Sequence, residues 1–562
     1  MAHKRWTPSA ARRTLARMDG LGALAWRMGR GARNSVVHLV LRQPLRGLSM
    51  ASVLAVVWTL LAGLFWAVLQ FLGQEQYLAF KDRLLESLLG VFFFALFFLV
   101  VVSDMVVVWS GLFRSRTAIF QAQAPIDDRA LYWIAAIEGG LWSSWAVVVL
   151  ALPLIGALTS EAAQPWRYAP AGMAVLIAFI LCCVAAGSVG ALLLARLIPL
   201  LRRGLRGIVA LVVAGLAAWG VFLLGGIEQH SRPTTIIHEV IGRLGFTENP
   251  FLPSSWTQQA LMAARASRWD DWLHHLLLLL STAGALALLG EWIARRRLRT
   301  ELDALTGRPD RSRAPRGRPW RAIPLLPADL GLLAAKDLRL FLRDPAQVLQ
   351  FTMFFGMLGF YLLMLPRLGR AFMLDEAWRP AVSLLNLTAI AMALATFTGR
   401  FVYPLLSLEG RRLWVLVLAP WPRTRVVTAK LAFALMVGLP VSVTLVALSG
   451  TMLALAPRVI VYQAFVIACM AVGLAAGALG IGARLADYTE DNPGKLVAGY
   501  GGNINLLASL LFSALLLAGA GLPLLAGGAA WAWIAGCAWT VLLTAAWSAL
   551  ALRMAWRWFA RP

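Results

Sequence analysis

The chain has 562 residues, of which 60% are hydrophobic and only 14% are charged, whereas a soluble domain carries about 25% charged residues. Its 52 lysines and arginines outnumber its 27 aspartates and glutamates, which gives a formal net charge of +25. Apolar runs of about 20 residues, long enough to cross a bilayer core, recur along the chain. The composition therefore excludes a soluble fold and predicts an all-α polytopic membrane protein.

The N-terminal stretch 1–34 is basic and lacks the compact apolar region and small-residue cleavage site of a signal peptide. We expect a cytoplasmic arm that rests on anionic lipid headgroups. A solvated tail is an equally good reading of the same composition.

Twelve apolar runs are candidate membrane spans, and a basic segment rich in Arg, Pro and Gly divides them into two sets of six. In the first half they lie near 49–72, 84–112, 131–158, 170–195, 207–227 and 274–294. In the second half they lie near 346–366, 380–406, 427–453, 459–482, 499–523 and 529–552. The expected domains after the arm are a first half at 35–296, a cytoplasmic linker at 297–327 and a second half at 328–562.

The positive charges fall mainly on one side of these spans. With the N-terminus in the cytoplasm, cytoplasmic segments hold 41 of the 52 lysines and arginines, counting Arg400 and Lys430 near the inner ends of their spans, and the outer loops hold 11. This is the asymmetry that the positive-inside rule expects. It accounts for the net charge through membrane topology, so we expect membrane lipids and no nucleic acid as partners. Both termini are expected in the cytoplasm.

The two halves resemble each other in sequence. "LVLRQP" ends at Pro44 before the first span, and "LFLRDP" ends at Pro345 before the seventh. Three further short matches follow in the same order, as a duplication would leave them. Six spans per half give both halves the same orientation, so the repeat is parallel. Each Arg-x-Pro ending predicts an interfacial elbow helix ahead of its half.

The segment "SLEGRRLWVLVLAPWPRTR", Ser407 to Arg425, lies between two spans on the cytoplasmic side. Its charges cannot enter hydrocarbon cheaply, and its prolines interrupt a continuous helix. We expect a short amphipathic helix, a Pro-broken corner and then the next span. The first half has a more acidic equivalent at Arg114–Arg129.

The order of elements, an elbow helix, then two spans, then a cytoplasmic helix that ends near Ala-Pro, resembles that of the permease subunits of ABC-2 type ATP-binding-cassette exporters. The stretches "RFVYPLLSLEGRRLWVLVLAPWPRTRVVTAK" and "ARLADYTEDNPGKLVAGYGGNINL" carry the resemblance most specifically. It implies that the loop between the second and third spans of each half is a coupling helix that docks on an ATPase. The implied coupling residues are Glu409, Arg411, Arg412, Trp414, Pro420, Arg423 and Arg425, and in the first half Arg114, Arg116, Pro125, Asp127 and Asp128.

The sequence contains no Gly-x-x-x-x-Gly-Lys-Ser/Thr loop to hold nucleotide phosphates. We therefore expect that the chain is not an enzyme by itself and has no catalytic residue. ATP and Mg are expected on a separate ABC ATPase subunit, present in two copies. The resemblance further implies an exporter in the bacterial cytoplasmic membrane.

A second cytoplasmic loop carries Asp487, Glu490, Asp491 and Lys495 ahead of a glycine-rich helix start. Its acidic residues suit the dipole of that helix, and an ATPase contact or gate is the alternative reading.

Few charges enter the spans. Asp104, Glu138 and Arg400 are therefore candidates for the transport pathway. Asp104 and Arg400 occupy nearly equivalent repeat positions, so an ion pair between them is possible, either for register or for substrate contact. The sparse polar lining favours a lipophilic or amphipathic cargo. The four cysteines lie in apolar runs and indicate neither a disulfide framework nor a metal site.

The long outer loop 228–273 contains "NPFLPSSWTQQALMAARASRWDDW", which predicts an amphipathic helix, either as a lid or as a passive interfacial helix. Two other functions compete with the exporter. A 6+6 secondary transporter also has parallel halves, but the loop after the second span lacks its Gly-x-x-x-Asp-Arg pattern. A lipid-linked transferase would need paired carboxylates or a histidine cluster, and we find neither pattern.

Overall fold

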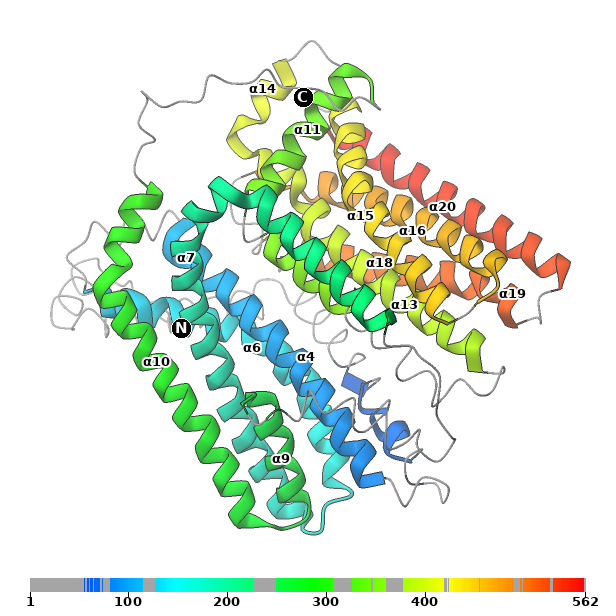
Figure 1. Cartoon of the computed structure of the whole chain (residues 1–562). Coiled ribbons are helices and arrows are strands. Elements are labelled where there is room, and N and C mark those ends of the chain that lie inside the picture. Colours follow the sequence, from blue (N-terminus) through cyan, green and yellow to red (C-terminus); the bar gives the residue numbers. More distant parts are fainter. Residues whose placement is uncertain are drawn as a thin grey trace, which may run out of the picture. The chain divides into compact units, whose positions relative to one another are not determined.

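The computed structural model describes residues 81–114, 127–225, 251–306, 326–344, 347–359, 378–418, 424–453, 455–488, 499–525 and 529–559, with short pieces elsewhere. Within some helices, such as α7 beyond Arg196, only the backbone is described. Every regular element in these ranges is a helix (Figure 1).

The main helices follow the predicted order. In the first half they are α4 (Lys81–Trp109), α6 (Asp128–Thr159), α7 (Pro165–Gly225), α9 (Pro253–Arg265) and α10 (Trp269–Thr306). In the second half they are α11 (Ala328–Arg343), α13 (Trp378–Phe397), α14 (Leu413–Leu418), α15 (Thr424–Met452), α16 (Pro457–Arg484), α18 (Tyr500–Ala520), α19 (Leu522–Leu525) and α20 (Ala530–Phe559). Short π-helices, η3 (Ser110–Arg114) and η6 (Thr398–Val402), follow α4 and α13.

In the described part of the chain, eight helices are long and apolar enough to cross a membrane, or nine if the two arms of α6, bent by 50°, form one span. This confirms an all-α polytopic membrane protein. The predicted spans 49–72 and 346–366 lie partly outside the described residues. The full number of twelve therefore stays a prediction.

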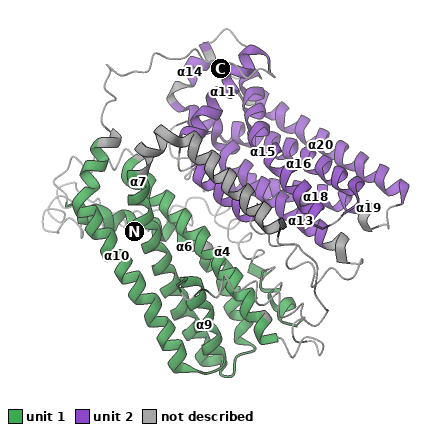
Figure 2. Cartoon of the chain, in the orientation of Figure 1, with its two compact units in different colours: residues 1–208, 241–309 green, residues 209–240, 310–562 purple. Residues whose placement is uncertain are grey.

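The chain divides into two compact units, coloured green and purple in Figure 2. One comprises Met1–Ile208 and Ile241–Pro309, and the other comprises Val209–Val240 and Asp310–Pro562. We describe each unit by itself.

Two helices extend beyond their predicted ends. The helix α7 runs without a break through the turn that we expected between the spans 170–195 and 207–227. That connection is rich in leucine and arginine, which are good helix formers. The helix α10 continues into the predicted linker as far as Thr306, because Leu298 and Leu302, one turn apart, are both buried.

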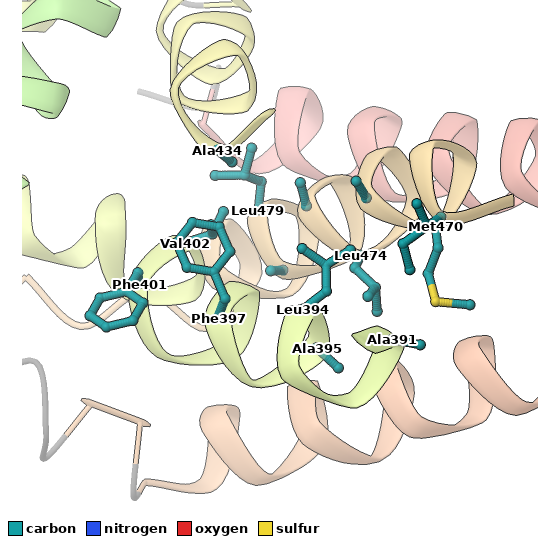
Figure 3. Close-up of a cluster of buried hydrophobic side chains, with 14 of the residues drawn as sticks. Ala391, Leu394, Ala395, Phe397, Phe401, Val402, Ala434, Met470, Leu474 and Leu479 are labelled. Carbon is teal, nitrogen blue, oxygen red and sulfur yellow. The ribbon is translucent and has the colours of Figure 1, made fainter. Parts of the chain in front are cut away.

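The core of the second unit forms around α16, the most enclosed of the candidate spans. Figure 3 shows Met470, Leu474 and Leu479 of this helix among side chains of α13 and α15. Its glycines allow close helix contact: a Cβ at Gly480 would lie 2.6 Å from the backbone oxygen of Ala551 on α20.

The helix predicted in the long outer loop is confirmed as α9. Nine of its thirteen residues are buried, so it does not lie passively at the interface as one reading expected. Small residues such as Ala260 and Ala264 allow this burial, and they join the apolar core of the first unit. The helix packs against α4 and α10.

Candidate functional site

The predicted coupling segment begins with two short helical pieces. Ser407–Arg412 forms tight 3-10 turns, and α14 follows directly. Inside the first piece, Gly410 has φ 50° and ψ −134°, which lies outside the regions that residues with a Cβ adopt readily. The segment therefore changes direction at Gly410. The expected short helix before the corner is confirmed.

A cluster of four charges, with Lys430 and Asp337 buried and Lys336 and Glu409 partly buried, fixes the first piece. One carboxylate oxygen of Glu409 lies 2.5 Å from Nζ of Lys336 and 2.6 Å from Nζ of Lys430. The Asp337 carboxylate lies 3.3 Å from both ammonium groups. Only 2% of the Lys430 side chain is exposed. The cluster joins α11, the coupling segment and α15.

The two positive and two negative charges of this cluster balance. A buried ammonium loses its hydration, and it is tolerated only where carboxylates replace that water with good geometry. Each lysine here has two acidic neighbours. The charges should therefore hold the three segments in one arrangement.

A helix, α11, lies where the elbow helix of the second half is predicted, and its interfacial position stays a prediction. Its C-cap Asp344 has extended backbone angles (φ −94°, ψ 100°), as the residue before Pro345 requires. Near this end the ring of Phe341 packs edge-on against Phe351 and Phe401, with centroids 5.7 and 5.5 Å apart. The equivalent stretch of the first half lies outside the described residues.

The second piece of the coupling segment is exposed. Trp414, Val415 and Leu418 have 62%, 52% and 74% of their surface accessible. Arg425, at the start of α15, pairs with Asp329 of α11. Only the backbone of Arg411 and Arg412 is described, and Pro420 and Arg423 lie outside the described residues.

The acidic residues of the first-half equivalent have partners within their own unit. Asp127 caps α6, where its carboxylate accepts the backbone N–H of Arg129 at 3.4 Å. Asp128 pairs with Arg299 of α10 at 2.8 Å. The described residues stop at Arg114, of which only the backbone is described, so Arg116 and Pro125 lie outside them.

Close to the start of α6, Glu291 of α10 contacts three polar groups. It pairs with Arg129 at 3.2 Å and with Arg295 at 2.6 Å, and the indole N–H of Trp133 donates to it at 2.8 Å. The start of α6 is thus attached to the end of α10. In the first half the charges of the loop pair with α10, whereas in the second half Glu409 pairs with α11 and α15.

The second cytoplasmic loop touches the coupling segment. The backbone N–H of Asp487 donates to the hydroxyl of Ser407 at 3.1 Å. Glu490, Asp491 and Lys495 lie outside the described residues. The sequence alone gave no sign that these two loops meet.

The intramembrane charges lie in different surroundings. Asp104 is fully buried, and it accepts hydrogen bonds from Ser143 at 3.2 Å and from Ser188 at 3.3 Å. Glu138 is exposed on α6. The guanidinium of Arg400 lies 5.6 Å from the ring centre of Phe354. Because Asp104 and Arg400 belong to different units, their ion pair stays a prediction.

Sequence reasoning did not select Lys336, Asp337 or Lys430. Lys430 could have been noticed, because it lies inside the predicted span 427–453, where it is followed directly by the apolar residues "LAFALM". A lysine at such a position needs an acidic partner.

Comparison with known proteins gives a family. A family model described as "putative ATP-binding cassette" matches residues 39–553. A search of curated proteins finds no match.

The match corrects two expectations from the sequence. We expected that the chain is not an enzyme and that ATP and Mg bind only to a partner subunit. The family description instead assigns an ATP-binding cassette to this chain. The assignment comes from the family match and from no motif.

The described residues themselves do not fit a nucleotide. None of them forms a strand that could lead into a phosphate-binding loop. The one Gly-Lys pair of the sequence, Gly494-Lys495, is followed by leucine and lies outside them. We therefore derive no step through ATP on residues of this chain.

The family match covers most of the sequence, and it falls on a chain with at least eight helices that can span a membrane. Together these findings indicate a transporter-related membrane protein. The chain belongs to the family described as putative ATP-binding cassette.

Proposed function

We propose that the chain forms the membrane pathway, or permease, of an ABC-2 type exporter that moves a lipophilic or amphipathic cargo out of the cytoplasm. The carrying observation is the buried cluster around Glu409. It connects the predicted coupling segment to α11 and to the foot of α15. Movement of that segment would therefore displace a membrane span.

The docking partner is an ABC ATPase subunit, in two copies. Trp414, Val415 and Leu418 are exposed, and Arg411 and Arg412 come shortly before them in the sequence. An aromatic residue with apolar and basic neighbours is the composition of a protein interface. A cytoplasmic location for this face follows from the distribution of positive charge.

Co-purification and vesicle transport test this proposal together. The tagged full chain is extracted gently, its partners are identified, and the complex is placed in vesicles that contain a fluorescent phospholipid. We expect an ABC ATPase to accompany the chain and ATP to drive outward movement of the lipid. Hydrolysis is measured on the chain alone and on the complex. Transport that survives ATP depletion and stops with an uncoupler would contradict the proposal.

Charge reversal locates the docking surface. Arg411→Glu with Arg412→Glu should release the ATPase from a chain that still folds. Arg458→Glu is the control, because Arg458 lies at the N-terminal end of α16, on the outer side in the predicted topology. Its guanidinium lies 5.8 Å from the ring centre of Trp533. Equal ATPase recovery with both variants would count against docking at this segment.

A further inference from the structure

The helix α9 turns directly into α10. The N–H of Ser267 donates to Ala264 and that of Arg268 donates to Ala263, at 3.1 and 2.9 Å. Ser267 takes the left-handed conformation, with φ 58°. These bonds form a Schellman motif, which ends a helix and reverses the chain. The two helices therefore form an antiparallel hairpin, which Figure 1 shows within the first unit.

The C-terminal end of α9 lies where α4 and α7 begin. Arg265 pairs with Asp82 at the start of α4 and with Glu161 at 3.3 Å, and Glu161 also pairs with Lys81 at 2.8 Å. The carbonyl of Arg265 accepts the N–H of Ala163 at 3.1 Å. This charged group marks one end of the unit, which is the outer end in the predicted topology.

The N-terminal end of α9 lies deep in the bundle. Leu261 reaches Gly172 of α7, where a Cβ would lie 3.6 Å from the leucine side chain. From Arg265 to Ser254 the helix rises roughly 16 Å. Counted antiparallel from the Asp82–Arg265 pair, Ser254 reaches the level of Phe93, which is fully buried in the first unit. In the predicted topology, in which α4 crosses the membrane, this places the N-terminal end of α9 at the depth of the α4 span.

This deep end carries polar groups without partners. Ser254, Ser255 and Gln258 are 0%, 0% and 1% exposed. Their hydroxyl oxygens and both amide atoms of the glutamine have no hydrogen-bond partner among the described residues. Thr257, equally buried, donates to the carbonyl of Pro253 at 2.8 Å. Within α9 itself the buried side chains without a partner are these three, all on its first two turns. Elsewhere in the described part of the first unit, single buried atoms of Gln164, Tyr168, Ser267 and Trp272 also lack a partner.

Buried polar groups at membrane depth are stable only when they are paired. Two hydroxyls and one amide can donate to an oxygen acceptor, and the positive end of the α9 dipole favours the same kind of group. The described ion pairs of this region gather at the opposite end of α9, around Arg265. Ser254, Ser255 and Gln258 can therefore bind the oxygen of a neutral group, since no charged side chain of the described residues pairs with them.

We propose that Ser254, Ser255 and Gln258 form a binding site for a neutral oxygen-bearing group, hydroxyl or carbonyl, of an amphipathic molecule. The proposed function is needed only to identify the bound molecule as the cargo of the exporter. The site itself requires neither ATP nor a partner subunit.

Photolabelling of the full chain in detergent tests the site. The probe is a monoacylglycerol with a diazirine at the start of its acyl chain, and the comparison probe is a diazirine alkane without a headgroup. Peptides from α9, α4 and α10 are then analysed by mass spectrometry. We expect saturable labelling of the α9 N-terminal end by the monoacylglycerol and not by the alkane.

The triple variant Ser254→Ala, Ser255→Ala, Gln258→Leu should reduce this labelling at least tenfold. It should also melt at a higher temperature than the wild type, because it removes unpaired polar groups from a buried place. Thr257→Val is the matched control and should keep the labelling. Equal labelling by both probes, or unchanged labelling of the triple variant, would overturn the site.

Failure of this site and failure of the proposed function give different results. Specific labelling of α9 without ATP-driven lipid movement would keep the site and remove the exporter. ATP-driven movement with indiscriminate labelling would keep the exporter and remove the site.

Discussion

The ammonium of Lys430 on α15 and the carboxylate of Glu409 in the coupling segment lie 2.6 Å apart, with 2% of the lysine and 14% of the glutamate side chain exposed. Breaking a contact of this kind is costly, because the remaining charge is left in a largely buried place without its partner. It directly connects the start of a membrane span to the loop before it.

Glu409→Gln should destabilise the chain by about 3 kcal/mol, because it leaves the buried ammonium of Lys430 and the partly buried ammonium of Lys336 with one carboxylate. The measurement is the melting temperature of the full chain in detergent. The double variant Glu409→Gln, Lys430→Met should recover most of the loss, since the charges balance again. A single variant that melts like the wild type would show that the cluster contributes little.

Gly410→Ala should cost about 1–3 kcal/mol, because a Cβ does not tolerate the backbone angles at this position. We expect a lower melting temperature and a weaker attachment of the ATPase, since the two pieces of the segment would change direction. Gly111→Ala is the control. Gly111 lies in η3, and nothing lies within 4 Å of the position of its missing Cβ. Equal effects of both variants would argue against a special role of Gly410.

Trp414→Ala should weaken ATPase binding at least tenfold, as truncation of a central aromatic residue does in many interfaces. The melting temperature should stay unchanged, because the side chain is 62% exposed. Trp142→Ala offers a matched control, since Trp142 on α6 is also 62% exposed. Binding is measured by titration of the purified ATPase. Loss of affinity in both variants would indicate a nonspecific effect.

Gly480→Ala should destabilise the second unit by about 1–3 kcal/mol, because its methyl group would force α16 away from the backbone of α20. Gly284→Ala on α10 should have the opposite effect. Nothing lies within 4 Å of its added Cβ, and alanine favours a helix over glycine by about 1 kcal/mol. Melting temperatures that move in the same direction would contradict the packing that we describe.

Most of the fold could be predicted from local sequence. Apolar runs predict α15 and α16 to within three residues at each end, and the Arg-x-Pro ending predicts where α11 stops, because length, hydropathy and proline act locally. The burial of α9 could not be predicted this way. Its serines and glutamine are typical of an exposed loop, and only its packing against α4 and α10 buries them.

The candidate site could be predicted only in part. Glu409 stood out by its charge in a basic loop, but its partners come from α11 and α15, 73 residues before it and 21 after it. No local pattern connects such distant positions. The acidic Asp127 and Asp128, by contrast, are accounted for by a helix cap and by a contact with Arg299.

The balance of charges in the Glu409 cluster also constrains how the sequence can change over time. Replacement of any one of Lys336, Asp337, Glu409 or Lys430 leaves an uncompensated charge in a buried place. A lineage that loses the carboxylate at 409 should therefore lose an ammonium at 336 or 430 as well. Descendants of this chain should exchange these residues in opposite-charge pairs, and the cluster should be visible as coupled substitution between positions far apart in sequence.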